Sequence, residues 1–212
     1  MIFFKDKQIK QYLIISGISL IVSFYLFEGY LTFFKGQLFK EQLYEKQTGK
    51  KFDTRTKNQI YEDIKKNNNK IKLTSHRSYY LNKNFPIHPL SGISNSETIH
   101  CNENGYYSIY KSDRYGFNNP DEEWYKQEIE YLLVGDSFTH GNCVNRPNDI
   151  ASVLRILSNK AVLNLGQNGN GPLSEYATLR EYLNSNVKKI LWIYYEQNDL
   201  EDLKKELSDK NL

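Results

Sequence analysis

The last third of the chain alternates short apolar runs with segments whose apolar residues recur every three or four positions. A short apolar run bounded by turn residues predicts a buried strand, and the wider spacing predicts an amphipathic helix. The predicted strands are 129–134, 161–165 and 190–195, and the predicted helices are 149–157, 173–183 and 200–207. This alternation predicts a parallel sheet, and right-handed crossovers then favour a three-layer, doubly wound α/β domain. Three parallel strands leave one edge of such a sheet open.

The N-terminal region has a different pattern, because residues 12–27 carry no charge and, after Glu28, residues 29–34 are again mostly apolar. Together they approach the roughly 20 apolar residues that span a bilayer. The run ends in aromatic residues and lacks the small-residue cleavage site of a signal peptide. We therefore expect a single-pass anchor over 12–34 after a cytoplasmic segment at 1–11, with a buried core helix as the alternative interpretation.

Two polar regions separate the anchor from the α/β part. Residues 35–70 are rich in Lys, Gln, Glu and Asn, which predicts a solvated helical stalk or linker. Residues 71–127 contain many turn signals and no helical period, so they are expected to form an irregular lead-in with short strands such as 106–110. The α/β domain itself is predicted to occupy 128–212.

Composition and charge limit which partners and which cellular compartment are expected for this chain. The 28 basic and 25 acidic residues are spread along the chain, and no tract combines Arg with aromatic residues, so a nucleic-acid partner is not expected. Lysines flank both ends of the predicted anchor, so the positive-inside rule does not fix its orientation. The even pair Cys101 and Cys143 favours a disulfide and hence an extracytoplasmic main domain, whereas a cytosolic domain would keep two free thiols.

Polar, glycine- or asparagine-bearing loops follow each of the three predicted strands, at the sheet edge where parallel α/β domains bind ligands. Ser137 lies between a strand and a helix, where its backbone N–H can face a developing oxyanion. Gly169 and Asn198 would add two more donors, as acyl transfer requires. The alternative is that Gly-Asp-Ser is an ordinary turn in which Asp136 caps the next segment.

These loops resemble the SGNH/GDSL hydrolase superfamily. Residues 135–141, Gly-Asp-Ser-Phe-Thr-His-Gly, are similar to its first block, whose serine is the nucleophile. Residues 164–169, Asn-Leu-Gly-Gln-Asn-Gly, are similar to its second block, in which the matching oxyanion glycine is Gly169, or Gly166 if the register differs. Residues 196–199, Glu-Gln-Asn-Asp, are similar to the third block, with Glu196 in the place of the usual glycine.

The resemblance implies a flavodoxin-like SGNH fold and an ester hydrolase or O-acyltransferase-like activity. Ser137 would be the nucleophile, with Gly169 and Asn198 in the oxyanion hole. The substrate would be an acyl ester, with glycan and lipid as candidate classes. No metal or cofactor is expected, because the glycine spacing does not fit a dinucleotide fingerprint and two distant cysteines without paired histidines make no zinc site.

The histidine base of the family is missing, because no histidine follows His140 and the Asp-x-x-His block is absent. A serine hydroxyl is a poor nucleophile without a base. Three interpretations stay open: an incomplete enzyme domain, a catalytically inactive membrane-anchored protein for glycan binding or assembly, or an enzyme with His140 as base. His76, His88 and His100 lie in loop-rich sequence and are expected at the surface.

One further element precedes the first block. Residues 112–118, Ser-Asp-Arg-Tyr-Gly-Phe-Asn, resemble an Asp-x-x-Gly-Phe element found before the catalytic domain in some membrane-anchored members of the superfamily. Its Arg114 either neutralises a substrate carboxylate or pairs with Asp113 or another acid as a structural contact.

Overall fold

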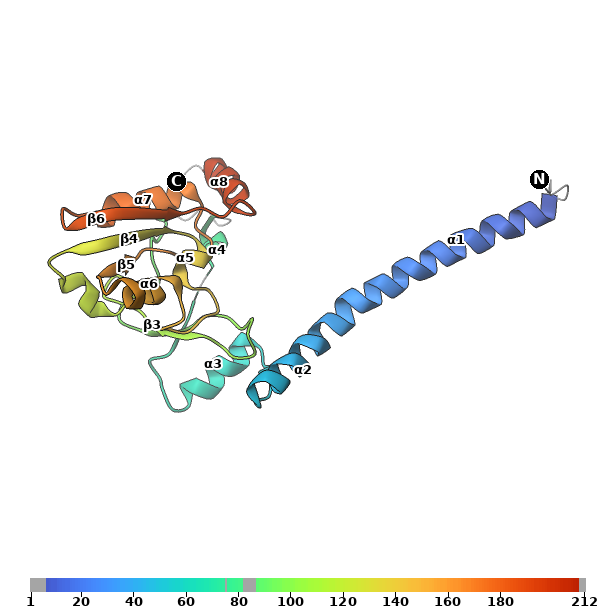
Figure 1. Cartoon of the computed structure of the whole chain (residues 1–212), viewed down its shortest axis with the longest axis horizontal. Coiled ribbons are helices and arrows are strands. Elements are labelled where there is room, and N and C mark those ends of the chain that lie inside the picture. The colour runs from blue at the N-terminus through green and yellow to red at the C-terminus, as the bar shows by residue number, and fades with distance from the viewer. Residues whose placement is uncertain (1–6, 75, 82–86, 210–212) are drawn as a thin grey trace. The chain divides into compact units, whose positions relative to one another are not determined.

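The first of two compact units is almost entirely helical. The computed structural model describes residues 7–74, 76–81 and 87–209, and the chain divides into Met1–Phe52 and Asp53–Leu212. In the first unit, helix α1 (Lys7–Tyr30) continues through a π-helical turn, η1 (Leu31–Lys35), into α2 (Gly36–Thr48) (Figure 1).

The continuous helix Gln8–Thr48 is long and apolar enough to cross a membrane by length and composition. No part of its most apolar window is buried, and side chains such as Leu13, Phe24 and Phe27 are exposed. A core helix of a water-soluble domain would bury at least one face. The buried-helix interpretation therefore finds no support within this unit.

The second unit begins with the lead-in region. Helix α3 (Lys57–Lys65) starts at a capping box, in which the Thr56 side chain accepts from the Gln59 N–H and the Gln59 side chain accepts from the Thr56 N–H. A small sheet follows, in the order β1-β2-β3, with the first pair parallel and the second antiparallel. The remaining bounds of this region are β1 (Lys72–Leu73), α4 (Ser78–Leu81), β2 (Glu97–Ile99), β3 (Ile109–Lys111) and the 3₁₀ helix η2 (Asp121–Tyr125).

The predicted alternation of strands and helices is confirmed in the rest of the unit. Three parallel strands form a second sheet in the order β5-β4-β6. Their bounds are β4 (Ile129–Gly135), β5 (Val162–Asn164) and β6 (Val187–Ile193), and the helices are α5 (Ser137–His140), α6 (Ile150–Ser158), α7 (Pro172–Tyr182) and α8 (Asp199–Ser208). The third strand begins three residues before the predicted start and ends before Tyr194. The chain is therefore a mixed α/β protein with small parallel sheets and one long apolar helix.

Alternate residues of β4 face opposite sides of this sheet, as strand geometry requires. Leu132 and Val134 belong to a buried cluster against which Leu179 and Tyr182 of α7 pack. Leu133 belongs to a second cluster, with Ala151 and Val162, against which Leu154 of α6 packs. Helices α6 and α7 thus contact opposite faces of the sheet (Figure 1).

The β5 edge is closed by a side chain. The Asn119 amide donates from Nδ2 to the Asn164 carbonyl over 2.9 Å, and its Oδ1 accepts from the Asn164 N–H over 2.9 Å. Asn119 is fully buried. Its amide therefore satisfies backbone groups that a neighbouring strand would otherwise pair.

The β6 edge is open. Among the described residues no strand pairs with its outer edge, and Ile190, Leu191 and Trp192 are 42%, 36% and 44% exposed. An apolar strand with free backbone groups is a template for pairing with another chain.

We therefore expect the full chain in detergent micelles to self-associate through β6. Ile190→Lys should lower the associated fraction in sedimentation velocity, because a charge on an edge strand opposes pairing. Ile156→Lys, on the exposed face of α6, is the matched control and should leave that fraction unchanged. Equal association of both variants and the unaltered chain would count against pairing at this edge.

Candidate functional site

The predicted nucleophile lies in a tight turn at the end of β4. Gly135 has φ of +157°, and a Cβ there would lie 2.1 Å from Thr139 Oγ1 and 2.7 Å from the Ile193 carbonyl oxygen. Only glycine fits so close an approach. Asp136 then caps α5, accepting the Phe138 N–H over 3.0 Å, and Ser137 is the first residue of the helix. The capping role proposed as an alternative is thus present, together with the serine at a helix start.

Two of the predicted site residues meet on one carboxylate oxygen. The Ser137 hydroxyl donates to Asp136 Oδ2 over 3.2 Å, and the Asn198 amide donates to the same oxygen over 3.1 Å. Asp136 is buried, whereas Ser137 is partly exposed. Asn198 also donates to Asp202 Oδ2 over 3.1 Å. An oxyanion near Ser137 would therefore have to take a proton donor of Asn198 away from a carboxylate.

The second loop lies against the serine turn through residues 166 and 167. The Gln167 N–H donates to the Gly135 carbonyl over 3.2 Å. A Cβ at Gly166 would lie 2.4 Å from the backbone nitrogen of His140. The Gly166 N–H is engaged by Asn164 Oδ1 over 2.8 Å.

Gly169, the other candidate donor, has φ of +80°, and a Cβ there would lie 2.5 Å from Cε1 of the His76 ring. No contact recorded among the described residues joins Gly169 to Ser137. The structure thus brings Ser137 and Asn198 together and places the second loop beside them. The role of Gly169 as an oxyanion donor stays a prediction.

His140 packs into the lead-in region. Its ring lies edge-on to the rings of His100 and Tyr110, with centroid distances of 4.5 and 4.8 Å. Burial lowers the pKa of His140 to about 4, so the imidazole is neutral near pH 7. The His140 ring therefore packs against His100 and Tyr110, which speaks against the interpretation of His140 as the base.

The expected surface position of the other histidines is wrong for two of them. His100 is only 3% exposed and lies 3.2 Å from the Asn168 amide nitrogen, and burial lowers its pKa to about 2. The His88 side chain is also buried, 3.7 Å from Asp209 Oδ2. The lead-in folds back onto the second loop and the end of α8, which its turn-rich sequence did not reveal. His76 is exposed as expected.

Sequence reasoning missed an acid beside this site. The buried Glu175 of α7 accepts the Trp192 indole N–H at Oε2 over 2.6 Å. Burial raises the pKa of Glu175 to about 8, and the neighbouring Asp199 and Asp136 carboxylates add to the rise. In the sequence, Glu175 looks like any acidic residue on the polar face of an amphipathic helix. Only its tertiary contact with Trp192 of β6 shows that it is buried beside the site.

Glu175 should make stability depend on pH. The folded protein keeps the Glu175 proton up to about pH 8, whereas the unfolded chain releases it near the ordinary pKa of 4.5. Stability should therefore fall as pH rises through this window, by up to about 1.4 kcal/mol per pH unit. Glu175→Gln should flatten this dependence in thermal denaturation, and the exposed Glu181→Gln on the same helix should not. An unchanged slope in Glu175→Gln would show that this carboxyl titrates normally.

Arg114 makes the structural contact rather than facing a ligand. Its Nε and Nη2 donate to the two carboxylate oxygens of Asp121 over 2.9 and 2.7 Å. Its guanidinium lies over the Tyr125 ring, 3.9 Å from the centroid. The partner is Asp121 and not Asp113, because the Asp113 carboxylate is occupied within its own turn.

The expected disulfide is present. Cys101 and Cys143 are bonded, with their Cα atoms 4.9 Å apart. The bond joins the segment after β2 to the loop after α5. In the described ranges, no group of three or more His, Cys, Asp or Glu side chains is arranged to hold a metal ion.

Comparison of the chain with protein-family models, with curated proteins and with solved structures finds no match. The class of chemistry is therefore indicated by the loops alone. They offer a serine hydroxyl at the start of a helix, a buried carboxylate that accepts its hydrogen bond, and a side-chain amide donor from Asn198, the N-cap residue of α8.

Proposed function

We propose that the second unit is a serine esterase or O-acyltransferase-like domain of the SGNH/GDSL type. The observation that supports this most is the meeting of the Ser137 hydroxyl and the Asn198 amide on Asp136 Oδ2, from two loops far apart in the sequence. The packing of α6 and α7 on opposite faces of a parallel sheet supports the finer proposal of a three-layer, doubly wound fold.

In this proposal Ser137 Oγ attacks an acyl carbonyl and passes its proton to Asp136, and the carbonyl oxygen becomes an oxyanion. When the oxyanion collapses, the bond to the alcohol breaks and the alcohol leaves with that proton. The acyl-serine is then cleaved by water or by an acceptor hydroxyl.

The donors assigned to this oxyanion are the Ser137 and Gly169 N–H groups and the Asn198 amide, which would first have to leave a carboxylate partner. A preorganised donor of this kind contributes about 3 kcal/mol. Asp136 orients the hydroxyl and is the acceptor that already binds its proton. A carboxylate is a weak base for an alcohol, so we expect slow turnover by these residues alone.

We also propose that the first unit is a single-pass anchor and that the second unit lies outside the cytoplasm. The length and apolar composition of the helix Gln8–Thr48 support the anchor. The Cys101–Cys143 disulfide supports an oxidising compartment. The ester would then be an acyl group on an extracytoplasmic glycan or lipid.

The test is hydrolysis of 4-nitrophenyl acetate by the full chain in lipid nanodiscs. Ser137→Ala should reduce the rate to the uncatalysed background, and Asn198→Ala should lower it by about 10²-fold, or to background, because one oxyanion donor is lost. Ser208→Ala, an exposed serine on α8, is the matched control and should retain the full rate. A rate that does not differ between the unaltered chain and Ser137→Ala would rule out catalysis by this serine.

A non-catalytic glycan-binding or assembly protein is the second candidate. The engagement of both Ser137 and Asn198 by Asp136 favours it, because a resting oxyanion hole should present free donors. Ester-independent binding of a glycan, without hydrolysis above background, would select this candidate.

A further inference from the structure

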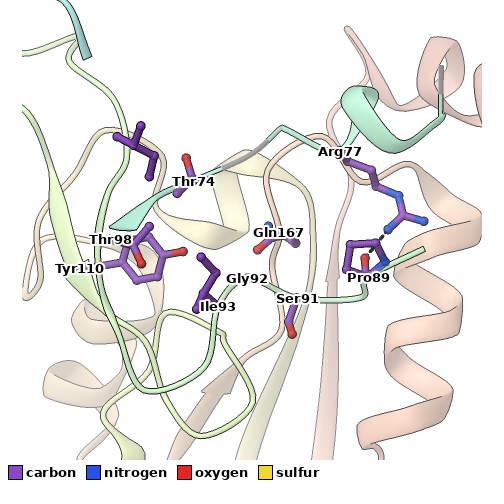
Figure 2. A pocket seen from close by; sticks show the side chains of 10 residues that line it. Thr74, Arg77, Pro89, Ser91, Gly92, Ile93, Thr98, Tyr110 and Gln167 are labelled. Atoms are coloured by element: carbon purple, nitrogen blue, oxygen red, sulfur yellow. Dashed lines mark hydrogen bonds between the residues drawn. The ribbon is translucent and has the colours of Figure 1, made fainter. Parts of the chain in front are cut away.

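A cavity of about 220 Å³ lies beside the second loop, between that loop and the lead-in region (Figure 2). Gln167 reaches it from the second loop, while Thr98 and Tyr110 reach it from β2 and β3. The Gln167 backbone N–H is the one that binds the Gly135 carbonyl. The cavity therefore borders the loop that joins the proposed site.

The cavity lining is suited to hydroxyl groups. Thr74 and Thr98 contribute hydroxyls, Tyr110 a phenol and Gln167 a side-chain amide, and Figure 2 shows them around one space. Gln167 is buried, and its Oε1 has no hydrogen-bond partner among the residues the structure describes. Mixed donors and acceptors over an apolar wall are typical of sites that orient a small polar ligand.

Among the described residues that line this cavity, one is charged, and it is a cation. Arg77 is 3% exposed, and its Nη1 donates to the Pro89 carbonyl over 2.7 Å. Its Nε lies 3.9 Å from Glu206 Oε1 and has no hydrogen-bond partner in the described part of the chain.

The Glu206 carboxylate makes its hydrogen bonds to groups other than Arg77. Its carboxylate caps the start of α7, accepting the N–H groups of Gly171, Leu173 and Ser174 over 3.0, 2.9 and 3.3 Å. The Glu206 and Asp209 carboxylates both act on the Arg77 charge. The Arg77 Nε–H still has no hydrogen-bond acceptor among the described residues, and a ligand carboxylate would supply one.

We propose that this cavity binds a single sugar-acid residue, with the carboxylate toward Arg77 and the ring hydroxyls toward Thr98, Tyr110 and Gln167. The volume is below the roughly 300–1,000 Å³ of sites for drug-sized ligands, which suits one hexose-sized ring. Binding of a sugar acid in this cavity does not depend on the proposed function. The further statement that this sugar acid belongs to the glycan of the ester substrate rests on the proposed function.

Binding is tested by titrating the full chain in nanodiscs with D-glucuronate, D-glucose and hexanoate by isothermal calorimetry. Glucuronate should bind at least ten-fold more tightly than glucose, which lacks the carboxylate, and than hexanoate, which lacks the hydroxyls. Arg77→Gln should reduce glucuronate affinity at least ten-fold, to the level of glucose.

Arg77 is buried, so Arg77→Gln could lose binding by unfolding. A second variant at a more exposed position therefore tests the same site. Ile93→Trp places a larger side chain at the partly exposed lining position 93 and should abolish glucuronate binding, whereas Ile156→Trp on α6 should leave it intact. Equal affinities for glucuronate and glucose, or unchanged binding by Ile93→Trp, would overturn the proposal. These titrations contain no ester and measure binding alone. Absence of esterase activity would therefore count against the proposed function but not against the sugar-acid site.

Discussion

Asp113→Asn should destabilise the second unit by about 3 kcal/mol, as expected when a buried hydrogen-bond network is broken and its donors lose their acceptor. The Asp113 carboxylate is fully buried and accepts four hydrogen bonds. Its donors are the Tyr115 and Phe117 N–H groups over 2.9 Å, the Asn119 amide over 2.9 Å and the Trp124 indole N–H over 2.7 Å. An uncharged amide offers one acceptor oxygen in place of two and adds two donors without partners.

The effect should spread because this turn positions two parts of the core. Phe117 packs with Leu132 and Leu163, and Asn119 closes the β5 edge. Chemical denaturation of the full chain in micelles, followed by tryptophan fluorescence, measures the change. Asp121→Asn is the matched control: its pair with Arg114 is partly exposed to solvent, so the loss should stay below about 1 kcal/mol. Similar losses in the two variants would contradict a central role for Asp113.

The Asp113 turn shows what the Asp-x-x-Gly-Phe residues at 112–118 do in the fold. The sequence shows Asp-x-x-Gly-Phe, and Gly116 has φ of +96°, with the Gly92 carbonyl 2.2 Å from where a Cβ would lie. The aspartate, the glycine and the phenylalanine are therefore all required by the local backbone and core. The arginine, whose charge suggested a ligand contact, forms a partly exposed ion pair with Asp121.

The parallel sheet could be predicted because its strands and helices each follow a local periodicity. Leu132, Leu133 and Val134 are buried on both faces of β4, which gives an unbroken apolar run in the sequence. The same reasoning placed Ser137 and Asn198 at strand ends, and two hydrogen bonds to Asp136 now join them. Periodicity could not show that the acceptor is Asp136, because that depends on the path of the loop after β6.

The lead-in region could not be predicted in this way. Its strands β2 and β3 have three residues each, too few to show a period. The burial of His100 depends on Asn168 and His140, which are 68 and 40 residues away along the chain. Such contacts follow from how the small sheet packs against the second loop, and no local pattern encodes them.

Cys101→Ser should lower the stability of the second unit by about 4 kcal/mol, because the disulfide closes a loop with a sequence separation of 42. In the chain-entropy account the bond removes open conformations from the unfolded state, and the benefit grows slowly with loop length. The bond also holds the segment after β2 beside Asn142 and Val144, in the loop that follows the serine helix. Loss of the bond should therefore loosen the packing of His100 and His140 as well as lower the midpoint of unfolding.

Thermal denaturation of the full chain in micelles, with and without dithiothreitol, measures this effect. Reductant should shift the unaltered chain to the midpoint of Cys101→Ser, and it should not shift the variant, in which Cys143 has no partner. Cys143→Ser should match Cys101→Ser, since either change opens the same loop. If reductant leaves the unaltered chain at its original midpoint after full reduction is verified by thiol titration, the bond contributes nothing to stability.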